Sequence, residues 1–268
     1  MSISRSGYYK WKYRKENPSM KELSRMEDIK LIKEVHNKRK SHRYRWINAF
    51  IKNKYGIVWS DNYVHRLCKY ESIRSQGKHY RWKKLGEQQY KFNNIVWNGW
   101  KRLKKPLEVI VSDMTAFKVK DIYYELSLYL DAWNKEILGY GLDLRKGSTR
   151  TYYDGLWQVI RKIKDWDKDQ VILHTDQGSV YSSKSYNDLI EDYNIIHSMS
   201  RAGTPTDNQV NESLNGWIKE ELIIDFNLKN CKDVPKLIEE YVWYFNNERP
   251  SYALKYKTPI QFKVESGF

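Results

Sequence analysis

The sequence predicts an α/β domain preceded by a small all-helical domain. In the second half, apolar β-branched runs at residues 107–113 and 170–175 alternate with segments of helical periodicity, which is typical of α/β folds. In the first half, apolar residues instead recur every three or four positions. At 268 residues and 32.4 kDa, the chain can hold one large core and one smaller domain.

Three helices are predicted in residues 1–73. Residues 19–39 have apolar side chains at helical spacing, a second helix ends before Gly56, and Ser60 is the expected N-cap of a third. The pattern alone fits a generic three-helix bundle as well as a DNA-binding helix-turn-helix. In the third helix, the residues expected to face outward are Asn62, His65, Arg66 and Lys69.

Charge favours the DNA-binding alternative. Residues 1–105 contain 28 Lys and Arg against 8 Asp and Glu, a net of +20, whereas residues 106–268 contain 20 against 25, a net of −5. A basic field of this size attracts polyanions, and the resulting binding depends strongly on salt. Aromatic residues lie between the cations and offer faces for base stacking. The further cations expected to contact DNA are Arg43, Arg45, Lys83, Lys84, Lys101 and Arg102.

Residues 74–105 are interpreted as a basic connector. A proline follows it directly, at the start of the first strand region. The α/β half is then expected to contain strand 107–113, a hairpin through 122–133 and 135–144, helix 149–164, strand 170–175, helix 183–193, strand 195–199, a helix that holds Glu212, and a last helix near 231–247.

Three acids are candidate catalytic residues and metal ligands. Asp113 and Asp176 each end an apolar strand pattern, and Glu212 falls 36 positions after Asp176 in an amphipathic helix. Carboxylates that converge from two strands and a helix suit Mg²⁺, which prefers oxygen ligands and supports displacement at phosphorus. The alternative is that these acids are ordinary turn or cap residues, since the chain has 33 Asp and Glu.

The sequence around Glu212 supports the first interpretation. Thr204 and Pro205 are typical of a helix start, which makes Asp207 a capping residue. Helical spacing gives the Glu212 face small and polar neighbours and a cation, as a surface that approaches phosphate needs. The residues of that face are Asn208, Asn215, Gly216 and Lys219.

Four segments resemble a known family: HTDQGSVYSS, SMSRAGTPTDNQVNES, LYLDAWNKEILGYGL and FNNERPSYALKYKTPIQF. They are similar to the second-reading-frame (OrfB) transposases of bacterial insertion sequences, in the DDE, retroviral-integrase-like superfamily. The resemblance runs from residue 4 to residue 262 and includes Lys219, seven residues after Glu212.

The resemblance implies a ribonuclease-H-like fold, a mixed five-stranded sheet flanked by helices. It divides the chain into a helix-turn-helix-like domain at 1–73, a connector at 74–105, a catalytic core at 106–226, and a C-terminal helix and tail packed on the core at 227–268.

The resemblance also implies the chemistry. Asp113, Asp176 and Glu212 would hold two Mg²⁺ ions, with Mn²⁺ as a substitute, for hydrolysis at the element's ends and then transesterification. Lys219 and Asn208 would position the DNA backbone. Around the site, His174, Thr175 and Gln177 would shape the Asp176 loop, and Ser198, Ser200 and Arg201 would form a mobile loop.

The implied partners are the insertion-sequence ends, target DNA and further copies of the chain. A further candidate is the helix-turn-helix protein of an upstream reading frame, to which such chains are often fused by frameshifting. Cys68 and Cys231 have no paired spacing, so neither a disulfide framework nor a zinc site is expected. The hydrophilic start and the absence of a long apolar run indicate no membrane partner and a cytoplasmic, nucleoid-associated bacterial protein.

Three alternatives remain at this stage. A ribonuclease-H-like nuclease would share the acids but has little use for a basic domain of this length. A serine or tyrosine recombinase would need a hydroxyl nucleophile and would form a covalent protein–DNA intermediate. The alternative that is not an enzyme is a DNA-binding, catalytically inactive regulator.

Overall fold

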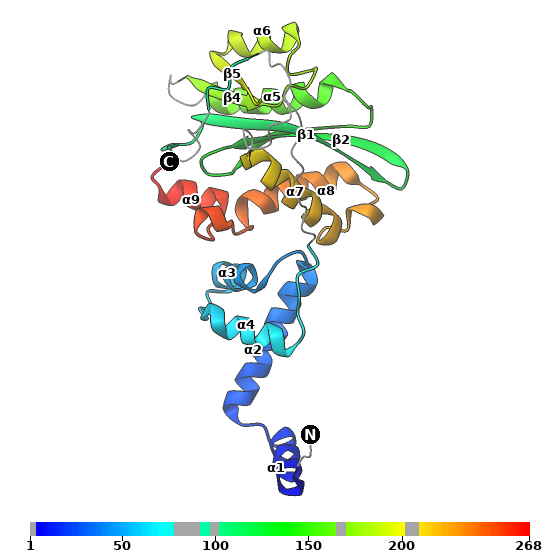
Figure 1. Cartoon of the computed structure of the whole chain (residues 1–268), viewed down its shortest axis with the longest axis vertical. Coiled ribbons are helices and arrows are strands. Elements are labelled where there is room, and N and C mark those ends of the chain that lie inside the picture. The colour runs from blue at the N-terminus through cyan, green and yellow to red at the C-terminus, as the bar shows by residue number, and fades with distance from the viewer. Residues whose placement is uncertain (1–3, 78–91, 97–101, 165–169, 202–208) are drawn as a thin grey trace. The chain divides into compact units, whose positions relative to one another are not determined.

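The computed structural model describes residues 4–77, 92–96, 102–164, 170–201 and 209–268 (Figure 1). The chain divides into two compact units, Met1–Gly77 and Lys78–Phe268. Within the described ranges, no helix combines the length and apolar character needed to cross a lipid bilayer.

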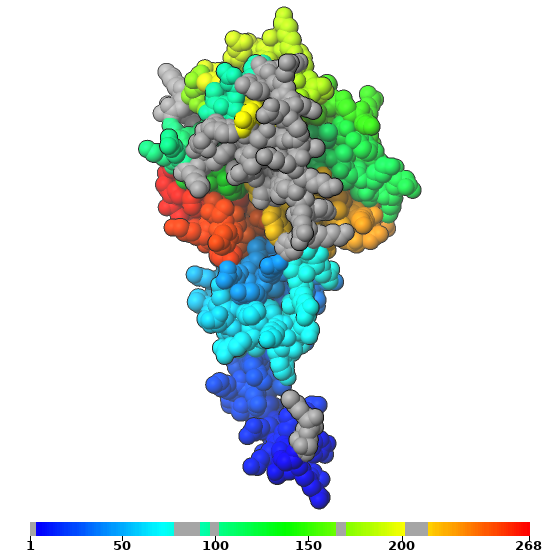
Figure 2. Space-filling model, viewed as in Figure 1, coloured from blue at the N-terminus to red at the C-terminus, as the bar shows by residue number. Residues whose placement is uncertain are grey.

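The first unit is helical. Its helices are α1 (Arg5–Glu16), α2 (Met20–Lys38), α3 (Tyr44–Tyr55) and α4 (Asp61–Tyr70). Helices α2, α3 and α4 pack on one another, which confirms the three predicted helices. Helix α1, dark blue in Figure 2, contributes no buried side chain. It was not predicted, because its sequence lacks an apolar face.

Capping residues set the ends of these helices. Ser19 forms a capping box with Glu22 at the start of α2, and the Ser60 side chain accepts a hydrogen bond from the Tyr63 amide at the start of α4. Helix α3 ends at Gly56, whose φ of 71° lies in the left-handed region that favours glycine. The predicted roles of Ser60 and Gly56 are confirmed.

The second unit is built on a mixed five-stranded sheet, as predicted. The strands are β1 (Val109–Val119), β2 (Ile122–Asp131), β3 (Ile137–Asp143), β4 (Val171–Thr175) and β5 (Ile195–Met199). Their order in the sheet is β3-β2-β1-β4-β5. Strands β1, β4 and β5 are parallel, whereas β2 and β3 pair antiparallel with the strands beside them.

Strand β1 is longer than the predicted strand 107–113, and Asp113 lies inside it instead of at its end. Parallel pairing with β4 stops at Ser112, but antiparallel pairing with β2 continues to Val119. The outer part of β1 has a neighbouring strand on one side only and carries mixed polar and apolar residues. It therefore lacks the apolar run from which a strand is predicted.

Helices cover both faces of the sheet. Helices α5 (Thr149–Lys164) and α6 (Lys184–Asp192) lie on one face, and α7 (Gln209–Ile224) and α8 (Val234–Asn247) lie on the other (Figure 1). Helix α8 was predicted to be the last helix, but α9 (Pro259–Glu265) follows it. Thr258 and Gln261 form a capping box at the start of α9. The predicted N-terminal residues of α7, Thr204, Pro205 and Asp207, lie outside the described residues.

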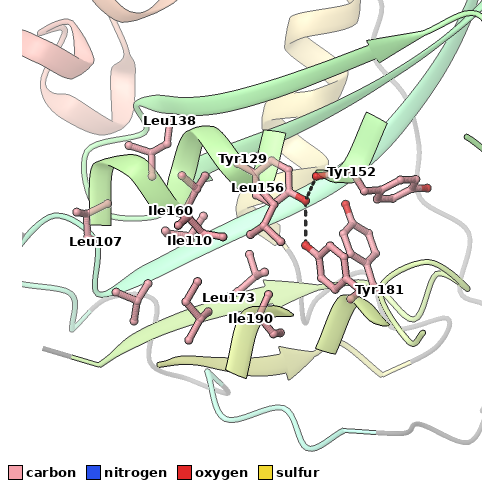
Figure 3. Packing of buried hydrophobic residues seen from close by; sticks show 14 of the residues in the cluster. Leu107, Ile110, Tyr129, Leu138, Tyr152, Leu156, Ile160, Leu173, Tyr181 and Ile190 are labelled. Carbon is pink, nitrogen blue, oxygen red and sulfur yellow. Dashed lines mark hydrogen bonds between the residues drawn. The ribbon is translucent and has the colours of Figure 1, made fainter. Parts of the chain in front are cut away.

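The core between the sheet and helices α5 and α6 is rich in tyrosine (Figure 3). Tyr129 donates a hydrogen bond to the carbonyl of Tyr152 and shares another with Tyr186. Gly155 lets α5 approach closely, since a Cβ at that position would lie 2.6 Å from the Tyr129 ring. The buried Tyr129 hydroxyl thus finds its partners inside the core.

Part of the predicted connector packs on the sheet edge. Val96 is buried, and the Ile95 amide donates a hydrogen bond of 3.1 Å to Ser198 Oγ in β5. The Phe92 ring lies 5.0 Å from the ring of His197. This described part of the connector therefore belongs to the second unit.

Candidate active site

Asp113 lies at the point where β1 leaves its parallel neighbour. Ser112 is paired with Thr175 of β4, so Asp113 and Asp176 each occupy the next position along adjacent parallel strands. Because parallel strands share their carboxyl-terminal edge, this register brings the two carboxylates together. Sequence alone predicted their meeting, and the pairing gives its physical reason.

Alternation along β1 sends neighbouring residues to opposite faces of the sheet. Ser112 Oγ shares a hydrogen bond of 2.7 Å with Tyr181 on the α5 and α6 face. Asp113 points the other way, and its Oδ2 accepts a hydrogen bond of 2.7 Å from Asn215 of α7. Asp113 Oδ1 accepts a second one, of 2.8 Å, from the Met114 amide.

Electrostatics around Asp113 disfavour its negative charge. Burial and the neighbouring Asp176 raise the pKa of Asp113 to about 6, although the hydrogen bonds from Asn215 and Met114 and the charge of Lys219 oppose the shift. Asp176 is exposed, yet the protein around its carboxylate excludes enough water to raise its pKa as well. A paired site of this kind gains stability when a cation binds.

The loop after β4 holds Asp176. The Gly178 amide donates a hydrogen bond of 2.9 Å to Asp176 Oδ1. A Cβ on Gly178 would lie 3.0 Å from that oxygen and 3.3 Å from the Tyr181 ring, so the loop has little room for a side chain there. Tyr181 is buried beneath the loop and was not singled out in the sequence, where a single tyrosine gives no special pattern.

Helix α7 contains Glu212, but the side chain of Glu212 lies outside the description, as does all of Asn208. The orientation of the helix is visible three residues later, where Asn215 is 7% exposed and contacts Asp113. Lys219, one turn further along that face, is exposed. The helix face predicted to carry Glu212 therefore meets the strand that carries Asp113.

The far end of α7 is held by an ion pair that sequence inspection missed. Glu221 is fully buried, and its carboxylate receives two hydrogen bonds from Arg249 Nε, of 2.8 and 2.9 Å. Tyr241 of α8 donates a third, of 2.9 Å. The partners are 28 and 20 residues away in sequence, so no local pattern indicates the pairing.

The oxygen donors present fit a hard divalent cation. Two carboxylates of raised pKa lie side by side, and Asn215 Oδ1 is buried with no hydrogen-bond partner among the described residues. No group of three or more His, Cys, Asp or Glu side chains that could hold a metal is found in the described part of the chain. Since that part excludes the Glu212 side chain, the third predicted ligand stays a prediction.

Other loop residues differ from their predicted roles. Ser198 is buried in β5, where it shares a hydrogen bond with His174 Nδ1, so it does not belong to a mobile loop. The Ser200 amide donates to the Thr175 carbonyl and continues the strand pairing. Arg201 is half-buried at the end of this segment.

The predicted DNA-contacting residues of the first unit lie on its surface. Val64, Leu67 and Cys68 of α4 are buried, as expected of its inner face. Lys83, Lys84 and Lys101 lie outside the described residues, and Arg102 is exposed. The predicted contacts on α3, on α4 and at the N-cap before α3 are all exposed: Arg43, Arg45, Asn62, His65, Arg66 and Lys69.

Comparison with known proteins connects this geometry to a family. The integrase core domain matches the chain twice, over residues 104–205 and 193–259. An uncharacterized transposase-like protein of Haemophilus influenzae is 30% identical over 162 residues, which cover 60% of this chain and 73% of that protein. The chain belongs to the insertion-sequence transposases of the DDE, integrase-like superfamily.

Other relatives agree with this assignment. The putative transposase InsK for insertion sequence element IS150 of Escherichia coli is 29% identical over 239 residues, which cover 88% of this chain and 83% of that protein. The integrase in a cryo-EM structure of the simian T-cell lymphotropic virus intasome has the same fold, with a TM-score of 0.51 and 16% identity over 81% of this chain and 74% of that chain. This transposase is therefore an enzyme that processes nucleic acid.

Proposed function

We propose that this transposase cleaves and joins DNA at the ends of its insertion sequence in a metal-dependent reaction. The observation that carries the proposal is the pair Asp113 and Asp176 at the shared edge of β1 and β4, with α7 attached to Asp113 through Asn215. Both carboxyls have raised pKa values, as expected of groups arranged to share a cation.

The proposed reaction has two displacements at phosphorus. Water attacks the phosphodiester at the element's end, the bond to the 3′ oxygen breaks, and the element keeps a free 3′-hydroxyl. That hydroxyl then attacks a phosphodiester of target DNA, and a target 3′-hydroxyl leaves. One bond forms and one breaks in each step, so no covalent protein–DNA intermediate is needed.

Asp113, Asp176 and Glu212 would hold two Mg²⁺ ions, or Mn²⁺ in their place. When bound, such ions activate the attacking oxygen and stabilise the leaving one. Asn215 fixes the rotamer of Asp113. Lys219 is exposed on the same helix face, where its ammonium is suited to bind a DNA phosphate, and Asn208 would contribute a further contact.

DNA recognition is assigned to the first unit and the basic connector. The exposed face of α4 would read the element's end, with Arg43, Arg45, Lys83, Lys84, Lys101 and Arg102 on the phosphate backbone. An insertion sequence has two ends, so we expect a homo-oligomer on DNA, with the upstream-frame helix-turn-helix protein as a further partner. A bacterial cytoplasmic, nucleoid-associated location follows from this substrate.

The test is cleavage of end DNA by three charge-removing variants, Asp113→Asn, Asp176→Asn and Glu212→Gln. Each should abolish cleavage with Mg²⁺ and with Mn²⁺ and leave end binding within about twofold, because the shape of the site changes little. Asp192→Asn, an exposed acid of α6, is the matched control and should cleave normally.

Two outcomes would contradict the proposal. End binding without any cleavage by the unaltered chain, with either metal, would favour a catalytically inactive regulator. Efficient cleavage of an RNA–DNA hybrid, with no preference for the element's ends, would favour a ribonuclease-H-like nuclease.

A further inference from the structure

The Asp176 loop is closed at both ends by one histidine from the neighbouring strand. At the start of the loop, Thr175 Oγ1 lies 2.9 Å from His197 Nε2. On the other side of the imidazole, His197 Nδ1 lies 2.5 Å from Asn187 Oδ1. Asn187 Nδ2 in turn donates a hydrogen bond of 2.9 Å to the carbonyl of Tyr181, beyond Asp176 in the same loop.

The hydrogen bonds of Asn187 fix the tautomer of His197. Asn187 Nδ2 donates to the carbonyls of both Tyr181 and Ser183, so both of its hydrogens are used and its oxygen must face the ring. His197 Nδ1 therefore carries the proton that Asn187 Oδ1 accepts. Nε2 of the neutral ring is then an acceptor, and it shares the one hydrogen of the Thr175 hydroxyl with the Asp176 carbonyl, which also lies 2.9 Å from Thr175 Oγ1.

The surroundings keep the ring neutral and shielded. Burial, together with His174, lowers the pKa of His197 to about 4, so the imidazole is uncharged at neutral pH. The Phe92 ring packs at 5.0 Å from the imidazole, and the Tyr186 ring at 6.2 Å. These rings cover part of the imidazole, which is half-buried.

We propose that His197 is a positioning residue for Asp176, which it holds in place by linking Thr175 to the Tyr181 end of the loop through Asn187. The proposal deepens the metal-dependent function proposed above and rests on it. Thr175 precedes Asp176 directly, so an unlinked Thr175 lets the aspartate change its backbone direction, while among the described residues the exposed carboxylate is held by a hydrogen bond from the Gly178 amide. Loss of the link is expected to weaken the affinity for metal, because metal binding needs Asp176 at a fixed distance from Asp113.

Thr175→Val tests the link with little change of volume. The variant keeps the branched shape in a buried position and removes the hydroxyl, which reaches both His197 and the Asp176 carbonyl, so the His197 variants below are needed to separate the two contacts. We expect Mn²⁺ binding by the DNA-free protein, measured by water-proton relaxation, to weaken about tenfold. Thr175→Ser, which restores the hydroxyl, should recover most of the affinity.

Two substitutions of His197 separate the two halves of the link. Glutamine reaches the position of Nε2 and can accept from Thr175, whereas asparagine reaches only the position of Nδ1 and keeps the Asn187 contact. His197→Gln should therefore bind Mn²⁺ more tightly than His197→Asn. If His197 were purely structural, the two variants would have similar Mn²⁺ affinities and would differ only in their melting temperatures.

Tyr153→Phe is the matched control, because it removes one hydrogen bond to Ser185 of α6 outside the Asp176 loop. It should bind Mn²⁺ like the unaltered chain. The positioning role is overturned if Thr175→Val does the same while melting normally. If the unaltered chain itself binds no Mn²⁺ and does not cleave end DNA, the proposed function fails instead, so the two failures are distinguishable.

Discussion

Asn215 donates a hydrogen bond from Nδ2 to Asp113 Oδ2 over 2.7 Å, across 102 residues of sequence. It is the direct link between the helix that contains Glu212 and the strand that carries Asp113. Asn215 lies three positions after Glu212, about one helical turn, so this contact aligns the Glu212 end of α7 with the first acid, while the Glu221 ion pair holds the far end of the helix.

Asn215→Leu should lower the rate of end cleavage by at least about tenfold, because a hydrogen bond to a charged acceptor contributes about 1.5–3 kcal/mol. Cleavage of a labelled end substrate at saturating Mg²⁺ is the measurement. Asn230→Leu is the matched control, since Asn230 donates only to Asn227 on the exposed surface. Equal rates for the two variants would mean that α7 is held in place without Asn215.

The raised pKa of Asp113 predicts a trade between stability and function. A carboxyl whose pKa rises to about 6 on folding favours the folded state at low pH, and this contribution is lost as the pH rises from about 4 through 6. At pH 7.5 without metal, Asp113→Asn should therefore be more stable than the unaltered chain by ~1–3 kcal/mol in the free energy of unfolding, and should unfold at a higher temperature.

The measurement is thermal unfolding at pH 4 and pH 7.5 after treatment with a chelator. The advantage of Asp113→Asn should be present at pH 7.5 and absent at pH 4. Asp131 also has a pKa of about 6, but it is present in both proteins and cancels in the comparison. If Asp113→Asn is less stable than the unaltered chain at pH 7.5, the charged Asp113 carboxylate does not destabilise the folded state.

Lys219 tests the orientation of α7 beyond the acids. It is exposed on the face that contacts Asp113, and its charge lowers the pKa of that residue. Lys219→Glu should reduce strand transfer of pre-cut ends by tenfold or more at low salt, because a phosphate contact becomes a repulsion. Lys236→Glu, the same change at an exposed position of α8, should have little effect. Similar losses would make Lys219 an ordinary surface charge.

The charge division between the two parts of the chain predicts their separate affinities. Residues 1–105, with a net charge of +20, should bind duplex DNA with an affinity that falls steeply as salt increases. Residues 106–268, with a net charge of −5, should bind weakly at every salt concentration. Fluorescence anisotropy at three salt concentrations gives both slopes. Comparable affinities at moderate salt would remove the first part from DNA recognition.

The elements that sequence predicted well are those whose pattern is local. The strand at 195–199 and the helix at 149–164 have the observed bounds, and the helix buries the apolar residues Tyr152, Leu156, Val159 and Ile160 at helical spacing. The acids Asp113 and Asp176 were singled out for a similar reason, since each follows an apolar run, and their catalytic role stays a prediction.

The contacts that sequence missed join distant positions. Asn215 was assigned to the correct helix face, but its partner could not be named without the parallel register of β1 and β4. His197 gave no hint of Asn187 or Thr175, because their pairing depends on how α6 and β5 close around the loop. Helix α1 escaped because helices are predicted from buried faces, and α1 has none.

The buried ion pair of Glu221 and Arg249 joins α7 to the segment that follows α8. Removing one member leaves the other charged, desolvated and without its partner, which typically costs 3–5 kcal/mol. Arg249→Met should therefore destabilise the second unit by about that amount, since the Glu221 side chain is completely buried. The double variant Glu221→Leu with Arg249→Met should recover much of the loss, because it removes both members of the buried charge pair. Urea unfolding of the three proteins measures both effects. If the double variant is as unstable as Arg249→Met alone, the arginine stabilises α7 through packing, and the charge of Glu221 is not the source of the loss.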